Sequence, residues 1–242
     1  MKVGVLVQFT SKTDIEAKFT ELKELGVDSC QLVCWDRPTL HDDAMVEKIN
    51  KAIEKFGIHV TAFWCGWEGR RVWDFYEGQL TLGLVPTDYR VERMKMILEG
   101  SDFAKKIHVT DLATHVGFMP ENPYDPKYEE VLVACKTIVA KCKENGQNFL
   151  FETGQETPVT LKRAIQDIEK ALGKGNVGIN LDPANLLMYG KSQTRWTLWR
   201  SSASMLWEST AKTANIRPTA ITSATKYPWA RAKSTTLPLS PN

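Results

Sequence analysis

The sequence predicts an α/β protein of the (β/α)8 barrel type, with about six strand–helix units recognisable and the last two strands missing or scrambled. Six apolar, strand-like runs alternate with helical patterns at intervals of about thirty residues, which is typical of parallel strands joined by crossover helices. The chain has 242 residues, slightly fewer than the roughly 250 of a complete barrel. One domain of this size has ample length for a large core.

The predicted elements follow one another regularly along the chain. Strand-like runs begin near Val3, Ser29, Ile58, Ile107, Asn148 and Val177. Helical patterns occupy Asp14 to Leu25, Asp42 to Phe56, Thr87 to Lys106, Pro126 to Glu144 and Thr157 to Leu172. Capping residues begin several of these helices and glycines end several of them, as expected for helix boundaries. The long segment from Trp67 to Pro86 follows the third strand, on the face where barrels carry their sites, and could act as a lid.

Composition argues for a protein that works in the cytoplasm. Five cysteines include no pair at two-residue spacing, and three lie in apolar runs, so we expect reduced, buried thiols. The amino-terminal apolar run is too short for a secretory signal, and no run reaches eighteen apolar residues. We therefore expect neither secretion nor a membrane partner.

The chain changes character after about residue 191. Residues 1–191 hold 24 Lys and Arg against 28 Asp and Glu, whereas residues 192–242 hold 7 against 1. The second segment contains no glycine and no aspartate, and it shows neither strand alternation nor a helical stripe. Its basic charges are spread thinly, without a Lys or Arg run, so we do not expect a nucleic-acid partner or a membrane tether. We predict domain boundaries of 1–191 for an incomplete barrel and 192–242 for an aberrant tail.

Two acidic residues mark the candidate active site. The segments FLFETGQE and VGINLDPAN each run an apolar stretch into an acid, Glu152 in the first and Asp182 in the second. Parallel barrel strands deliver such residues to one open end, so the two carboxylates are expected to converge. Converging carboxylates indicate a divalent cation or proton-transfer chemistry. Alternatively, Glu152 caps the helix that starts at Thr157, and Asp182 caps a helix that starts at Pro183.

With these segments, the opening MKVGVLVQF and the stretch ATHVGFMP, residues 1–191 resemble the xylose isomerase-like TIM barrel family of sugar phosphate isomerases and epimerases. The resemblance implies one divalent cation (Mn, Mg, Co or Zn) held by Glu, Asp, His and Glu from four successive strand ends. Glu152 matches the first ligand and Asp182 the second. It also implies that Glu152 is the catalytic base, which removes a proton beside a carbonyl to form an enediolate. The partner would be a small sugar or sugar phosphate, and a homo-oligomer is possible.

Members of this family continue with a segment containing VH-x-KDG and PLGEG and end with a strand that carries the last glutamate, none of which occurs here in frame. Read one nucleotide out of register, the tail can nevertheless spell such a segment, including VHGKDG and PLGEG. The single codon of tryptophan restricts this alternative reading: Trp196–Thr197 requires Asp, while Trp207–Glu208 and Trp229–Ala230 require Gly. We therefore predict a frameshift, in the gene or its sequencing, near Gly190 to Ser192.

Seven further residues are candidates for substrate binding, each with a structural alternative: His115, Asn185, Glu156, Trp35, Trp64, Trp67 and Gln8. The tryptophans follow strands two and three, where they could pack on a sugar ring or hold the long loop down; we favour the second. His115 could bond a substrate hydroxyl or phosphate, or serve local structure. Asn185 could bond a sugar hydroxyl or end a turn. Glu156 could contact substrate or cap a helix. Arg70 and Arg71 could receive a phosphate, but an exposed loop pair is more often a solvated surface.

Whether this chain is an active enzyme stays open from sequence alone, because it lacks the third and fourth ligands of the family. Impaired or absent isomerase or epimerase activity is the leading expectation. The alternatives are a non-catalytic remnant or binding protein, an inositol-type dehydratase (a lyase), and an endonuclease IV-like hydrolase. The acidic body with its four histidines argues against the last, which needs a multi-zinc cluster and a basic groove.

Overall fold

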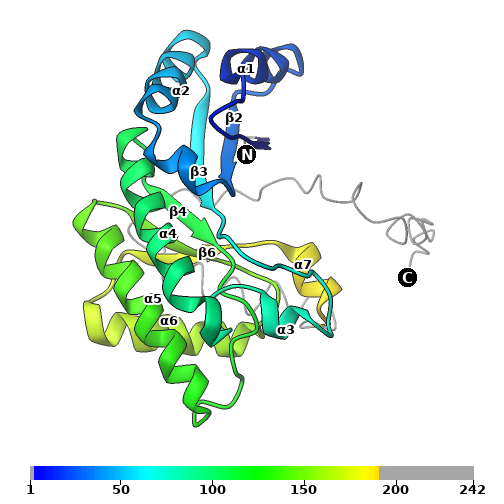
Figure 1. Ribbon diagram of the computed structural model, residues 1–242, viewed down its shortest axis with the longest axis vertical. Coiled ribbons are helices and arrows are strands. Elements are labelled where there is room, and N and C mark those ends of the chain that lie inside the picture. The colour runs from blue at the N-terminus through cyan, green and yellow to red at the C-terminus, as the bar shows by residue number, and fades with distance from the viewer. Residues whose placement is uncertain (1–2, 191–242) are drawn as a thin grey trace, which may run out of the picture.

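The computed structural model describes residues 3–190, which form one parallel sheet of six strands in the order β1-β2-β3-β4-β5-β6 (Figure 1). The strands are β1 (Val5–Gln8), β2 (Ser29–Cys34), β3 (His59–Cys65), β4 (Asp111–Thr114), β5 (Asn148–Glu152) and β6 (Val177–Asn180). Each strand lies beside its neighbours in the sequence, as in a partial (β/α)n barrel. The six predicted strands and their parallel arrangement are confirmed. The predicted tail, 192–242, lies outside the described residues.

Helices connect the strands in the predicted order. The helical elements are α1 (Ile15–Glu24), η1 (Arg37–His41), α2 (Asp43–Phe56), α3 (Gly78–Thr81), α4 (Thr87–Lys106), α5 (Pro126–Glu144), α6 (Pro158–Leu172) and α7 (Pro183–Met188). The cap residues identified in the sequence act as such: the Thr157 hydroxyl accepts from Thr160 N at 3.2 Å, and Gly57 ends α2 in the left-handed conformation with φ 61°. The short elements η1 and α3 were not predicted, whereas α7 begins at Pro183, where the capping alternative for Asp182 expects a helix.

The two faces of the sheet have different chemistry. The outward face packs on the helices through a large apolar core that includes Phe63, Leu112 and Phe149, all fully buried. The inward face carries a much smaller apolar group, Val33, Trp64 and Ala113, together with polar side chains. All five cysteines are buried and free, as the sequence predicted. Alternation of side chains along each strand therefore separates a structural face from one that carries chemistry.

A buried arginine, Arg93 on α4, holds the long segment between β3 and α4. Only 1% of this side chain is exposed, and its guanidinium donates to four main-chain carbonyls, those of Glu68 (3.1 Å), Arg70 (2.7 Å), Thr81 (2.8 Å) and Gly83 (2.7 Å). The group also stacks on Trp67 and Tyr89, at 4.2 and 4.4 Å from the ring centroids. One side chain thus satisfies backbone acceptors along most of the segment.

Replacement of Arg93 by Met should lower the free energy of unfolding by about 3 kcal/mol or more, because four buried carbonyls lose their donor. Urea unfolding followed by far-UV circular dichroism measures this change. The exposed Lys95 on the same helix, which pairs with Glu92, provides the matched control, and Lys95→Met should change stability by about 0.5 kcal/mol or less. Equal effects of the two substitutions would contradict the role given to Arg93.

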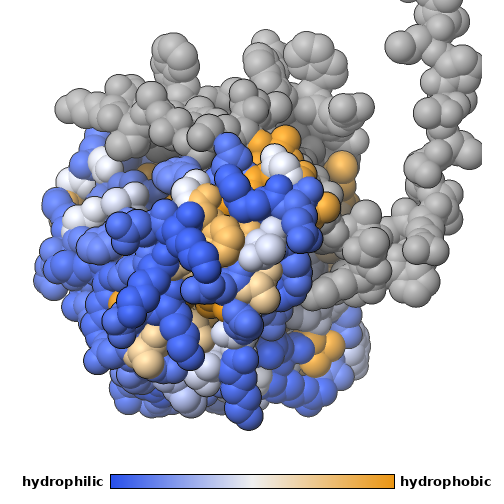
Figure 2. Space-filling view, turned by 90° about the horizontal axis from the view of Figure 1, so that it is seen from above, coloured by the Kyte–Doolittle hydropathy of each residue, from blue (hydrophilic) through white to orange (hydrophobic). Residues whose placement is uncertain are grey.

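Hydrophilic side chains cover most of the face seen in Figure 2, with small apolar patches among them. Many of the charges on the helices form surface pairs, for example Lys55 with Glu16 at 2.6 Å and Lys106 with Asp43 at 2.7 Å. Each such pair contributes little to stability. Within residues 3–190, no helix combines the length and the apolar character that crossing a membrane requires.

Candidate active site

Glu152 is the last residue of β5, and its carboxylate is buried on the inward face of the sheet, with 7% exposed. It pairs in register with Asn180, the last residue of β6. The Asn180 amide donates to Oε2 of Glu152 in a short hydrogen bond. The Gln31 amide on β2 donates in turn to Oδ1 of Asn180 at 3.0 Å. These three side chains therefore form a chain of hydrogen bonds across the inside of the partial barrel, from β2 to β6.

Burial controls the ionisation of Glu152. Loss of solvation raises the pKa of this carboxyl to about 8, and repulsion from Asp182 and Glu156 adds to the effect. The hydrogen bond from Asn180 and a contact with Trp64 oppose it. Glu152 is consequently poised to bind and release a proton near neutral pH, as a general base requires.

Thr153 joins the loops that carry the two acids. The amide N of Asp182 donates to the Thr153 hydroxyl at 2.8 Å, and Thr153 N donates to Asn180 O at 3.1 Å. The carboxylate of Asp182 caps α7, with Oδ1 accepting from the amides of Ala184 (2.8 Å) and Asn185 (3.1 Å). The capping alternative is thus present in the structure, and it engages one oxygen of the carboxylate. Burial also raises the pKa of Asp182.

Four tryptophans gather beside this cluster. Trp35 contacts Trp64, Trp67 and Trp73, with ring centroids 4.9, 5.2 and 6.3 Å apart. Trp67 is fully buried, stacks under Arg93, and donates from Nε1 to the carbonyl of His115 at 3.3 Å. Its position favours the predicted loop-anchoring role. Trp64 lies on the inward face of β3 and contacts Glu152, so it lies nearest to the candidate base.

His115 and the loop after β5 complete the site. His115 is 6% exposed, and its ring meets Trp64 and Trp73 edge-on, at 5.4 and 5.0 Å between centroids. Burial lowers the pKa of His115 to about 3, against a smaller opposing effect of Gln155, so the imidazole is neutral at physiological pH. Glu156 is buried in the same loop, close enough to influence the pKa of Glu152.

The two remaining candidates lie at the margins of the site. Asn185 is half-buried on α7 and donates from its side chain to the carbonyl of Thr153 at 3.2 Å, so one end of its amide serves local structure. Gln8 pairs in register with Val33 at the end of β1 and is exposed. Substrate binding by either residue stays a prediction.

Several residues of the site carry no signal that the sequence alone would reveal. Gln31 and Asn180 sit inside apolar strands, Thr153 and Gln155 follow the strand-end glutamate, and Trp73 lies in the long loop. Uncharged polar residues occur at such positions in many proteins. The register of β5 with β6 places Asn180 beside Glu152, and the approach of β2 to β6 brings Gln31 to Asn180. The sequence alone shows neither of these contacts.

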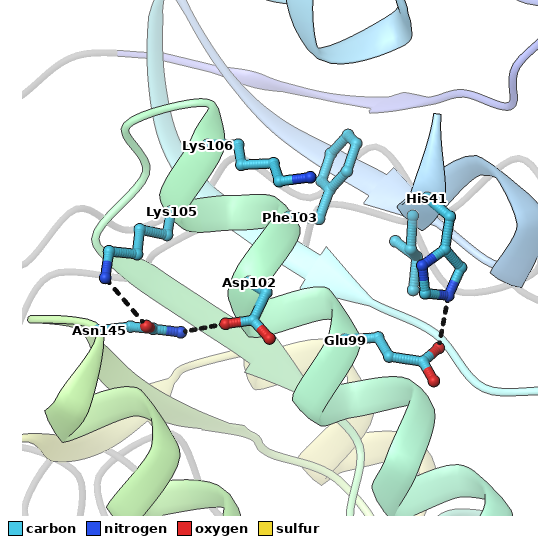
Figure 3. Close-up of a pocket in the computed structure, with 8 residues that line it drawn as sticks. His41, Glu99, Asp102, Phe103, Lys105, Lys106 and Asn145 are labelled. Atoms are coloured by element: carbon cyan, nitrogen blue, oxygen red, sulfur yellow. Dashed lines mark hydrogen bonds and ion pairs between the residues drawn. The ribbon is translucent and has the colours of Figure 1, made fainter. Parts of the chain in front are cut away.

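A separate pocket of about 410 Å³ lies against the carboxyl-terminal half of α4 (Figure 3). Its charged side chains already pair with neighbours: Glu99 with Arg37 and His41, Asp102 with Lys141, Lys105 with Asn145 and Lys106 with Asp43. Because α4 leads into the amino end of β4, this pocket lies away from the strand ends that carry Glu152 and Asp182.

The donor chemistry of Glu152 and Asp182 fits a divalent cation. Burial raises the pKa of both carboxyls, and repulsion from Asp182 adds to the rise at Glu152. A bound divalent cation would favour the ionised form of both groups. Within the described part of the chain, no group of three or more His, Cys, Asp or Glu side chains is placed to hold a metal ion.

The chain belongs to the xylose isomerase-like TIM barrel family, whose profile matches residues 19–217. A crystal structure of a xylose isomerase domain protein from Planctomyces limnophilus is similar, with 27% identity and a TM-score of 0.74 over 84% of this chain and 70% of that one. Among proteins of curated function, none matches the sequence.

Two epimerases of known structure share the fold at lower identity. The 3-keto-D-glucoside 4-epimerase of E. coli is 17% identical, with a TM-score of 0.59 over 85% of this chain and 76% of that one. A D-psicose 3-epimerase from Clostridium cellulolyticum H10, crystallised with D-tagatose, is 14% identical, with a TM-score of 0.58 over 85% of this chain and 71% of that one.

The raised pKa of Glu152 predicts a specific pH dependence of stability. Between the ordinary carboxyl value of 4.5 and about 8, the folded chain keeps a proton that the unfolded chain releases. The free energy of unfolding should therefore fall as the pH rises through this window. Glu152→Gln removes the titration and keeps an acceptor for Asn180, so it should be more stable than the parent chain at pH 8, by on the order of 2 kcal/mol.

Urea unfolding at pH 5, 6.5 and 8 tests this expectation. The exposed Glu144 offers a control, since Glu144→Gln should change stability by about 0.5 kcal/mol or less at each pH. Identical pH profiles for the parent chain and Glu152→Gln would show that the carboxyl titrates normally.

Proposed function

We propose that this site belongs to a metal-dependent isomerase or epimerase of a small sugar or sugar phosphate. The observation that carries the proposal is Glu152, a strand-end carboxylate buried beside Asp182 with its pKa raised to about 8. Membership of the xylose isomerase-like family and the similarity to two sugar epimerases support it. The five buried cysteines form no disulfide, which supports a cytoplasmic location for the protein.

In this proposal Glu152 removes a proton from the carbon beside a substrate carbonyl and holds it on the carboxyl. Asn180 and Gln31 fix the orientation of the carboxyl, while Trp64 and its neighbours exclude water from one side. Glu152 and Asp182 would hold a divalent cation, which stabilises the negative oxygen of an enediolate when it is bound. Return of this proton by Glu152 to the neighbouring carbon completes an isomerisation, whereas an epimerisation needs a second acid that protonates the opposite face.

We further propose that the chain as written has little or no activity. The family resemblance implies that a histidine and a second glutamate complete the metal site, and that this glutamate supplies the second acid/base. The segment 192–242 contains no histidine and a single glutamate, Glu208. Two carboxylates hold a cation more weakly than four ligands. A one-nucleotide frameshift near Gly190 to Ser192 accounts for the loss, and the domain limits 1–191 and 192–242 follow from it.

Metal binding tests the proposal that Glu152 and Asp182 are metal ligands. Isothermal titration with Mn²⁺ at pH 7.5 should show weak binding that Asp182→Asn and Glu152→Gln each reduce by about ten-fold or more. Asparagine caps helices as well as aspartate, so Asp182→Asn preserves the start of α7. Glu144→Gln again serves as the control. Mn²⁺ affinity that is unaffected by the two site substitutions would refute the assignment of the ligands.

Deuterium exchange tests the proposal that the family reaction removes a proton beside a carbonyl and that the 242-residue chain has lost this activity. In D₂O with Mn²⁺, a chain in which one base restores the reading frame should exchange the proton beside the carbonyl of a ketose, as followed by NMR across a panel of ketoses and their phosphates. The 242-residue chain should exchange at least about 10³-fold more slowly, because the second acid/base is missing. Full activity of the 242-residue chain would refute the frameshift hypothesis.

A further inference from the structure

We propose that Gln155 and His115 form a hydroxyl-binding subsite that makes the site selective for a polyhydroxylated substrate without a phosphate group. The inference rests on the sugar isomerase or epimerase function proposed above and narrows its substrate class. Gln155 is a residue that the sequence did not single out.

The first support is a set of buried polar atoms without partners. Gln155 is 1% exposed and His115 is 6% exposed, yet Oε1 and Nε2 of Gln155 and Nδ1 of His115 make no hydrogen bond of normal geometry within residues 3–190. The two side chains approach each other closely enough for Gln155 to affect the pKa of His115. Buried polar groups in folded proteins are nearly always satisfied, and leaving them unpaired costs stability. A group that stays unpaired beside a candidate active site is therefore best explained by a ligand that it binds.

The chemistry of these atoms matches hydroxyl groups. The Gln155 amide offers both a donor and an acceptor, and the neutral imidazole of His115 offers one of each. The two side chains lie in contact, so they can address neighbouring hydroxyls of one polyol. Trp64 and Trp73 flank the His115 ring, edge-on at 5.4 and 5.0 Å. Aromatic surfaces of this kind suit the apolar C–H face of a sugar.

Charges around the subsite disfavour a phosphate. The nearby ionisable groups, Glu152 and Asp182, are acidic. The arginines of the adjoining loop are already engaged. Arg71 stacks on Trp35 at 4.4 Å and donates to the carbonyl of Trp67 at 3.1 Å. Arg70 pairs with Glu77, and the Arg93 guanidinium is enclosed by carbonyls. Phosphate recognition needs charged or multiple N–H donors, whereas a neutral hydroxyl needs only the groups present.

Ligand-observed NMR titration of the 242-residue chain without added metal tests the subsite. The probes are D-fructose, D-fructose 6-phosphate and inorganic phosphate. D-Fructose should bind at least about ten-fold more tightly than its 6-phosphate, and inorganic phosphate should not compete with it. Gln155→Leu and His115→Phe should each weaken D-fructose binding by about five- to ten-fold. Equal or tighter binding of the phosphate ester, unchanged affinity in both variants, or no binding of D-fructose would overturn the proposal.

A second buried glutamine gives a matched control. Gln147 is 3% exposed, accepts from Ser101 Oγ at 2.6 Å and donates to the carbonyls of Ser101 and Val109 at 3.0 and 3.2 Å. Gln147→Leu should lower the thermal midpoint and leave the preference for D-fructose intact. Gln155→Leu should leave the midpoint unchanged or raise it, because no hydrogen bond within residues 3–190 is lost.

The control separates the possible failures. If Gln155→Leu destabilises the chain as much as Gln147→Leu, then Gln155 is structural and the subsite is refuted. Sugar binding requires no turnover. Selective binding of D-fructose, combined with no deuterium exchange in the frame-restored chain, would keep the subsite and refute the isomerase or epimerase function instead.

Discussion

The burial of the Glu152 carboxyl at the end of β5 is the constraint on which the rest of the site depends. Loss of solvation makes an ionised carboxylate costly there, so the group must be neutral, hydrogen-bonded or paired with a cation. Asn180 supplies the hydrogen bond, and Gln31 orients Asn180. Thr153 ties the adjoining loop to the one that carries Asp182. The hydrogen bonds around the Glu152 carboxyl therefore require β2, β5, β6 and the loop after β6 to lie close together.

The same constraint links the site to the shape of the sheet. Among the described strands, β1 and β6 each pair with only one neighbour, so these six strands do not close into a barrel. The hydrogen bond between Gln31 on β2 and Asn180 on β6 nevertheless crosses the interior. In Figure 1, α7 lies near α3 of the long loop, and Tyr189 contacts Phe75 and Phe118, at 5.4 and 5.6 Å between ring centroids. Residues on and after β6 therefore contact β2 and the loops after β3 and β4 across the interior.

The strands, the long helices and the two acids were predictable because each leaves a periodic or positional signal. Glu152 and Asp182 stand out as charges at the ends of apolar strands, α4 stands out by its length, and α5 stands out by its length and its cap at Asp125. The hydrogen-bond partners were not predictable, because Gln31 and Asn180 are far apart in the sequence. Arg93 looks like one more helix-surface cation until the loop carbonyls converge on it. The short helix α7 has too few residues to show a helical period.

Sequence and structure together separate two kinds of residue in the tryptophan cluster. Trp67 is sealed between Arg93 and the His115 carbonyl, which fits a residue that anchors the loop. Trp64 and Trp73 meet the neutral His115 ring edge-on, and Trp64 also contacts Glu152. In the long segment after β3, Trp67 holds the loop in place and Trp73 lines the candidate site. This arrangement fits a loop with a fixed position better than a mobile lid.

The central claim is that Glu152 stays protonated at neutral pH until a cation replaces its proton. Carbon-13 NMR of the labelled glutamate carboxyls, assigned through Glu152→Gln, measures this directly. Without metal, the Glu152 resonance should titrate near pH 8, and saturating Zn²⁺ at pH 7 should shift it to the ionised position. A resonance that titrates near 4.5 without metal, or that does not respond to Zn²⁺, would contradict the account.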